Sequence, residues 1–109
     1  MRQDLATLQN KPLVLHVVET MEEAKIGYRA IERKDGEGML FSFSKMIALP
    51  ISVGRNGGPL DVCWLERGRV VAMASHLGGM LVSQADAALE LPVGWLKENN
   101  IKLGDRLVV

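Results

Sequence analysis

The residues of this sequence that could do chemistry are few and widely spaced. The histidine and cysteine side chains are His16, Cys63 and His76, and no two of them stand close together along the chain. Zinc sites usually take their ligands at short, paired spacings. Cys63 lies within an apolar run, where a thiol usually packs as an inert small hydrophobe. The spacing therefore predicts no metal, no cofactor and no catalytic residue.

Polar residues that could contact a ligand occur in one glycine-rich loop and beside two expected strands. Arg55 and Asn56 lie in the loop 54–59, which lacks the Gly-Lys-Ser/Thr ending of a phosphate-binding loop, so a plain hairpin loop is the simpler interpretation. Asp61 could either hold a ligand or accept hydrogen bonds from nearby backbone amides. We take Arg55, Asn56, Asp61 and His76 as the candidate ligand-binding residues.

Length and composition limit the class of protein. The chain has 109 residues, 48% of them hydrophobic and 24% charged, which fits one ordinary globular domain. The formal net charge is zero, which disfavours nucleic acid as a partner and permits self-association into a homodimer. A single cysteine, no signal peptide and no apolar run of about 20 residues predict a cytoplasmic protein with no membrane contact. A chain trimmed of a leader would look the same.

Short apolar runs bounded by turn residues predict a protein built mainly from strands. His16 interrupts the first run and is expected to be a buried, hydrogen-bonded core histidine. The two-residue gap at Arg67-Gly68 predicts a hairpin. The expected strands are 13–18, 39–43, 49–53, 60–66, 69–74, 77–82, 87–91 and 107–109.

Two short helices complete the expected elements. Thr20 and Glu23 fit a capping box, followed by an apolar face of Met21, Ala24, Tyr28 and Ile31. A second helix is expected over 93–99, opened by Pro92, anchored by Val93, Leu96 and Trp95 and stopped by Asn99-Asn100, with Ile101 and Leu103 packing back. The fold class is therefore mainly β (α+β): a small antiparallel β-barrel or rolled sheet with two short helices. Residues 1–11 are expected to form an N-terminal arm and residues 12–109 the single domain.

Four stretches resemble the domain-of-unknown-function family numbered 192, a prokaryotic group. They are "VVETMEEAKIGYR", "GEGMLFSF", "PLDVCWLERGRVV" and "ALELPVGWLKENNIKLGDRL", in the family's order and spacing. The resemblance implies a β-rich, barrel-like domain and no established catalytic activity. It departs from the family at residues 51–56, where the family's Phe-Trp-Met-Lys-Asn-Thr is replaced by Ile-Ser-Val-Gly-Arg-Asn, so a site formed by that motif is lost or reshaped here.

Three functions are compatible with these residues. The first is a non-enzymatic binding or accessory domain for a small ligand or a protein partner. The second is a DNA-binding regulator of the swapped-hairpin barrel type, because "LPVGWLKENNIKLGDRLVV" also resembles the end of such proteins. The third is a small hydrolase-like enzyme using Asp61 and His76, although no nucleophile-elbow pattern accompanies them.

Overall fold

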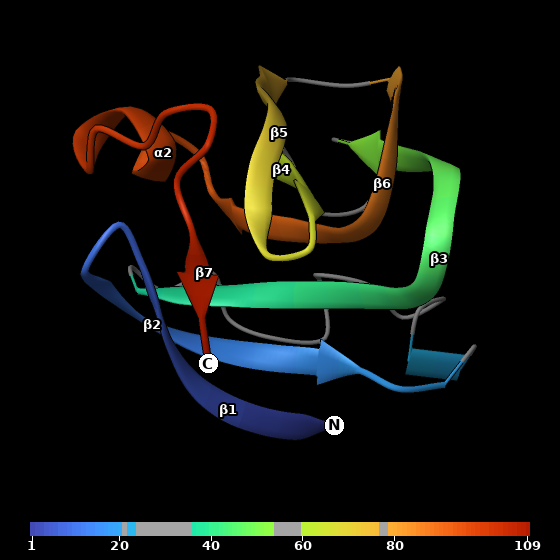
Figure 1. The fold of residues 1–109 in the computed structure, drawn as a ribbon, viewed down its shortest axis with the longest axis horizontal. Coiled ribbons are helices and arrows are strands. Elements are labelled where there is room, and N and C mark those ends of the chain that lie inside the picture. Colours follow the sequence, from blue (N-terminus) through green and yellow to red (C-terminus); the bar gives the residue numbers. More distant parts are fainter. Residues whose placement is uncertain (21, 24–35, 54–59, 77–78) are drawn as a thin grey trace.

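The computed structural model describes the chain except residues 21, 24–35, 54–59 and 77–78, and it describes no side chains for residues 43–53, 76 and 79–83. The described elements form one seven-stranded sheet in the order β5-β4-β6-β3-β2-β1-β7, with one short helix (Figure 1). The protein is therefore mainly β, as predicted. The elements are β1 (Arg2–Leu8), β2 (Lys11–Val18), β3 (Glu37–Val53), β4 (Leu60–Glu66), β5 (Arg69–His76), β6 (Gly79–Pro92), α2 (Trp95–Glu98) and β7 (Leu107–Val108).

Two tight hairpins set the register at the two ends of the sheet. In the β4–β5 turn Arg67 and Gly68 have φ values of 51° and 80°, and this hairpin confirms the prediction. In the β1–β2 turn Gln9 and Asn10 have φ values of 49° and 63°. Positive φ at both central residues is the type I′ geometry that matches the twist of the flanking strands. Residues 1–11 are thus not a loose arm, because this turn folds Arg2–Leu8 back onto β2.

Two long strands replace four predicted short ones. β3 spans both 39–43 and 49–53, and β6 spans 87–91 and part of 77–82. Their pairing shifts register between Ser42 and Ile47, where β3 carries extra residues. A bulge of this kind bends a strand and sharpens its twist. Both strands turn a corner together in Figure 1, which curls the sheet into a half-barrel.

One pairing departs from the predicted antiparallel sheet. β2 and β3 are parallel, with His16 opposite Met39. Parallel neighbours need a long crossover connection, and here it runs over 19–36. The predicted capping box begins it: the Glu23 amide donates to Thr20 Oγ1 at 3.1 Å and Glu23 Oε1 accepts the Thr20 amide at 3.1 Å. Residues 22–23 are helical, whereas the predicted apolar face of this helix lies outside the described residues.

The two end strands of the sheet meet at one corner. An isolated bridge joins Arg69 of β5 to Arg106, next to β7. The Val70 amide donates to Asp105 O at 2.9 Å, and the Leu107 amide donates to Gly68 O at 2.7 Å. These bonds hold the curled sheet together where a fully closed barrel would have a continuous seam.

Apolar side chains form a cluster on each face of the sheet. The inner cluster includes Leu8, Leu15, Leu89 and Leu91, all fully buried, and it receives Trp95 from α2. The outer cluster includes Met39, Val62 and Trp64. Both tryptophans are 3% exposed, as expected of core anchors.

The C-terminal segment partly follows the prediction. Leu96 and Ile101 are buried, and Asn100 has the left-handed conformation (φ 55°) that stops α2. Val93 and Leu103 do not anchor this segment, because they are 53% and 64% exposed. Pro92 ends β6 and Gly94 (φ 88°) turns the chain, so Val93 falls on a solvent-facing bend before the helix begins. None of the described helices has the length and hydrophobicity needed to cross a bilayer.

Candidate functional site

Asp61, the predicted carboxylate, is fully buried on the inner face of β4. Its Oδ1 accepts a hydrogen bond from Ser75 Oγ at 2.5 Å, and its Oδ2 accepts one from the Leu96 amide at 2.9 Å. Helix α2 has Gly94 at its N-cap, a residue with no side chain to accept from the first amides. Asp61 supplies that acceptor from a distant strand, since Leu96 is the second residue of the helix. These contacts give Asp61 a structural role, and a ligand contact for it stays a prediction.

The other predicted ligand-binding residues are not joined to Asp61 by any described contact. His76 ends β5 and pairs with Leu60, one position away from the Asp61–Ser75 pair, but its side chain lies outside the description. Arg55 and Asn56 lie outside the described residues altogether. Within the described ranges, no group of three or more His, Cys, Asp or Glu residues is placed to hold a metal ion.

Cys63 is a buried free thiol. Desolvation, reinforced by the negative charge of Asp61, raises the pKa of Cys63 from 9.0 to about 12. The thiolate is the nucleophilic form of cysteine, so a thiol held protonated in this way is unreactive at neutral pH. Cys63 therefore packs in the inner cluster as the sequence predicts.

Three polar residues, His16, Glu37 and Glu90, lie near one another on the outer face of the sheet, and the sequence analysis does not predict this cluster. His16 is 7% exposed, and its Nε2 lies 3.0 Å from Glu37 Oε1, so the predicted buried and hydrogen-bonded histidine is confirmed. Glu90 is 6% exposed and lies across the sheet from His16, with Met39 between them. Glu37 and Glu90 each make a further interaction. The sequence does carry a signal for this cluster: Glu90 stands inside an apolar strand, and burying a carboxylate there costs free energy unless it has a partner.

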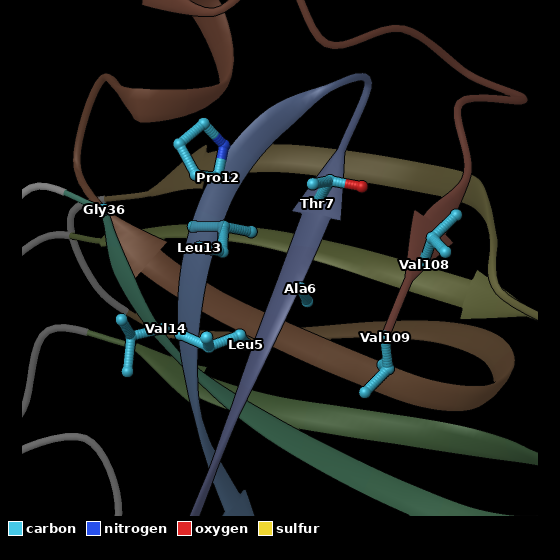
Figure 2. A pocket seen from close by; sticks show the side chains of 9 residues that line it. All are labelled: Leu5, Ala6, Thr7, Pro12, Leu13, Val14, Gly36, Val108 and Val109. Atoms are coloured by element: carbon cyan, nitrogen blue, oxygen red, sulfur yellow. The ribbon is translucent and has the colours of Figure 1, made fainter.

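An open groove of about 620 Å³ lies on the outer face of β1, β2 and β7 (Figure 2). The register places Leu5 opposite Val14, and Thr7 opposite both Pro12 and Val108. Leu5 is 78% exposed and Val109 is 73% exposed. The lining is Leu5, Ala6, Thr7, Pro12, Leu13, Val14, Gly36, Val108 and Val109.

The groove offers no general acid or base among the described residues that line it, because their only polar side chain is the hydroxyl of Thr7. It can bury an apolar group from another molecule. Sequence reasoning missed it because residues 1–11 are expected as an arm and residues 107–109 only as the last strand of the sheet. The signal that could have found it is Leu5, which lies out of phase with the buried alternation of Ala6 and Leu8.

Comparison with solved structures finds two proteins with this fold. One is provisionally described as a transcription regulator, from Sinorhizobium meliloti 1021; it superposes with a TM-score of 0.84 at 20% identity, over 97% of this chain and 92% of that one. The other is a protein of unknown function from Novosphingobium aromaticivorans DSM 12444, with a TM-score of 0.79 at 22% identity, over 98% of this chain and 85% of that one. At these identities the likeness concerns the fold alone. No curated protein matches the chain in sequence.

The family resemblance found in the sequence is confirmed over nearly the whole chain. The model of the family DUF192, described as "Uncharacterized ACR", matches residues 5–109. The match covers the second half of β1, all of β2, the bent β3–β6 pair and the helix held by Asp61. This chain therefore belongs to the DUF192 family of uncharacterised domains.

Proposed function

We propose that this protein is a non-enzymatic binding domain, and that its outer groove docks an apolar segment of a partner protein. The observation that carries the proposal is the exposure of Leu5, Val108 and Val109, which all line one groove. Scattered exposed hydrophobic residues are normal on a protein surface, whereas a contiguous group marks an interaction site.

The shape and the borders of the groove favour a protein over an enclosed small molecule. Small-molecule pockets usually bury about 70–90% of their ligand. A groove lined by Leu5, at 78% exposure, is too open to enclose one. Polar residues border it: Gln3 is exposed two positions before Leu5 on the same face of β1, and Glu37, which pairs with Val14, is partly exposed. An apolar centre inside a polar rim is the usual anatomy of a protein–protein interface.

Selection from a displayed library of random extended peptides tests this proposal. We expect enrichment of peptides with alternating apolar residues, whose binding to the purified protein is abolished by Val108→Asp. The matched control is Val93→Asp, because Val93 is 53% exposed against 52% for Val108 and lies outside the groove. Circular dichroism of both variants checks that they fold. Peptides that bind Val108→Asp as well as the natural chain would contradict the proposal, and so would a library with no enriched sequence.

DNA binding is the second candidate, because the Sinorhizobium protein of this fold is provisionally described as a transcription regulator. Arg67, Arg69 and Arg106 are exposed on the two turns joined by the isolated bridge, where phosphates could be contacted. Fluorescence anisotropy with a mixed-sequence duplex at about 50 mM salt should then show binding that weakens with added salt. No binding under that condition would dismiss this candidate.

The hydrolase-like alternative has less support. It needs Asp61 to act on a substrate, whereas both of its carboxylate oxygens already accept hydrogen bonds within the protein. A cytoplasmic location and a prokaryotic origin stay expectations from the sequence and from the family.

A further inference from the structure

In the part of the chain that the structure describes, strand β1 leaves most of one edge open. It pairs with β2 along its whole length, but β7 covers its other edge only at Thr7 and Leu8. No other described residue pairs with the remainder of that edge. The two-residue turn makes Leu8 and Lys11 a hydrogen-bonded pair. Every second residue of β1, counted back from Leu8, therefore points its amide and carbonyl toward β2, and the residues between them point theirs toward the opposite edge. The amides and carbonyls of Gln3 and Leu5 therefore face the open edge, as those of Thr7 face β7.

From this edge we infer that two copies of the chain associate by antiparallel pairing of β1 with β1, with Gln3 opposite Gln3 of the second copy. Exposed strand edges are templates for pairing, and proteins normally cover or charge them. The inference goes beyond the proposed function, because the dimer does not require the groove to hold a partner.

The charges of β1 are complementary to themselves in this register. Arg2 and Asp4 flank Gln3, so a two-fold axis through Gln3 sets each Arg2 opposite Asp4 of the other copy. Oppositely charged residues directly across an antiparallel pair stabilise it. Within one chain Arg2 Nε lies 3.3 Å from Asp4 Oδ2 and Arg2 Nη1 lies 2.9 Å from Glu19 Oε1, and the side chains of Arg2 and Asp4 remain solvent-accessible.

The apolar side chains agree with the same register. Leu5 is 78% exposed, whereas the side chain of Met1 is only 12% exposed within its own chain. The pairing places Met1 of each copy opposite Leu5 of the other, so the exposed Leu5 side chain loses contact with water. It also leaves β7 in place, because pairing over residues 1–5 ends before Thr7. Registers centred closer to Thr7 would require the second copy to displace β7.

Analytical ultracentrifugation from about 10 μM to about 1 mM tests the dimer, since a short strand interface is expected to be weak. We expect a reversible dimer whose dissociation constant rises at least tenfold in Arg2→Asp and in Asp4→Arg. The two variants mixed in equal amounts should associate again, because the aspartate introduced in one chain then lies opposite the arginine introduced in the other. An effect confined to the contacts within one chain cannot be repaired by mixing two folded variants. Lys97→Asp, a charge reversal at an exposed site on α2, should dimerise as the natural chain does.

Disulfide trapping gives an independent measurement. Opposed residues of a hydrogen-bonded antiparallel pair lie about 5.5 Å apart between Cα atoms, within the range of a disulfide. Gln3→Cys should therefore form a cross-linked dimer on mild oxidation, whereas Gln84→Cys, exposed on another strand, should not. A natural chain that stays monomeric to about 1 mM would overturn the inference. A mixture that fails to associate, or single variants that dimerise normally, would overturn it too. None of these results depends on peptide binding by the groove, so the two proposals can fail separately.

Discussion

Replacing Asp61 by alanine should loosen helix α2 from the sheet. In the native protein the Leu96 amide is buried and donates to Asp61 Oδ2 at 2.9 Å. Gly94 cannot replace that acceptor, because the N-cap of α2 makes no side-chain hydrogen bond. The variant thus leaves a buried N–H without a partner at the place where Trp95 and Leu96 enter the inner cluster.

The expected cost follows from the two contacts of the carboxylate. Leaving a buried donor unsatisfied costs about 1–3 kcal/mol. Ser75 adds little, because it is exposed and its hydroxyl can turn to water. Removing the carboxyl group also opens a small cavity, at about 1 kcal/mol. We therefore expect a loss of about 2–4 kcal/mol, or about 8–16 °C in Tm for a domain of this size.

Denaturant unfolding followed by tryptophan fluorescence measures this loss, because Trp95 sits on the helix that Asp61 holds. Ser75→Ala should cost no more than about 1 kcal/mol. Asp105→Ala is the matched control, since Asp105 Oδ2 also accepts a backbone amide, that of Lys102 at 2.7 Å, but in an exposed turn. A loss in Asp61→Ala no larger than that in Asp105→Ala would refute the capping role argued for Asp61.

Three further outcomes are expected. With its pKa raised to about 12 from 9.0, Cys63 should react with iodoacetamide at pH 8 about a thousandfold more slowly in the native protein than in denaturant, and rapid native labelling would contradict its burial. Gly38→Ala should lower the free energy of unfolding by about 1–3 kcal/mol in chemical denaturation. The Cβ of the alanine would lie 2.9 Å from Leu91 Cδ2 and 3.0 Å from the carbonyl oxygen of Glu90. An unchanged denaturation midpoint would mean that β3 and β6 are not so close. The Glu19 amide, helped by the N-terminal ammonium group, lowers the pKa of Glu23 below its ordinary 4.5, so the carboxylate stabilises the fold above that value and the effect is lost as the pH falls through the lowered pKa. Glu23→Gln should flatten the stability profile in that acidic range, and a profile parallel to that of the natural chain would count against the capping box.

The sequence predicts those parts of the fold that depend on interactions between residues close together along the chain. The Arg67-Gly68 hairpin, the capping box at Thr20 and the stop of α2 at Asn100 each depend on residues within one turn of the chain. Gln9-Asn10 forms the same kind of turn but lacks glycine, so its signal is weaker. The strand before it, β1, mixes polar and apolar residues without a strong alternation, which is why its sequence predicts an arm.

The features that the sequence could not predict depend on distant residues. The bend at residues 43–46 resembles a break between strands in the sequence, whereas pairing with β6 keeps β3 continuous through it. The parallel pairing of β2 with β3 follows from the crossover, and no residue pattern within either strand states it. Asp61 could be proposed as a cap, but its partner, Leu96, is 35 positions away. The groove likewise joins residues from both ends of the sequence.

The central position of β6 bears on how the protein opens. Ala88 faces the outer cluster and Leu89 faces the inner one, and both residues pair with β3 on one side and β4 on the other. Neither the inner nor the outer cluster can be exposed to water without breaking the β6 pairing that also supports the other cluster. Amide hydrogens along this segment should therefore exchange with solvent only through global, cooperative unfolding, while those at the ends of β1 and β7 should exchange by local fluctuations.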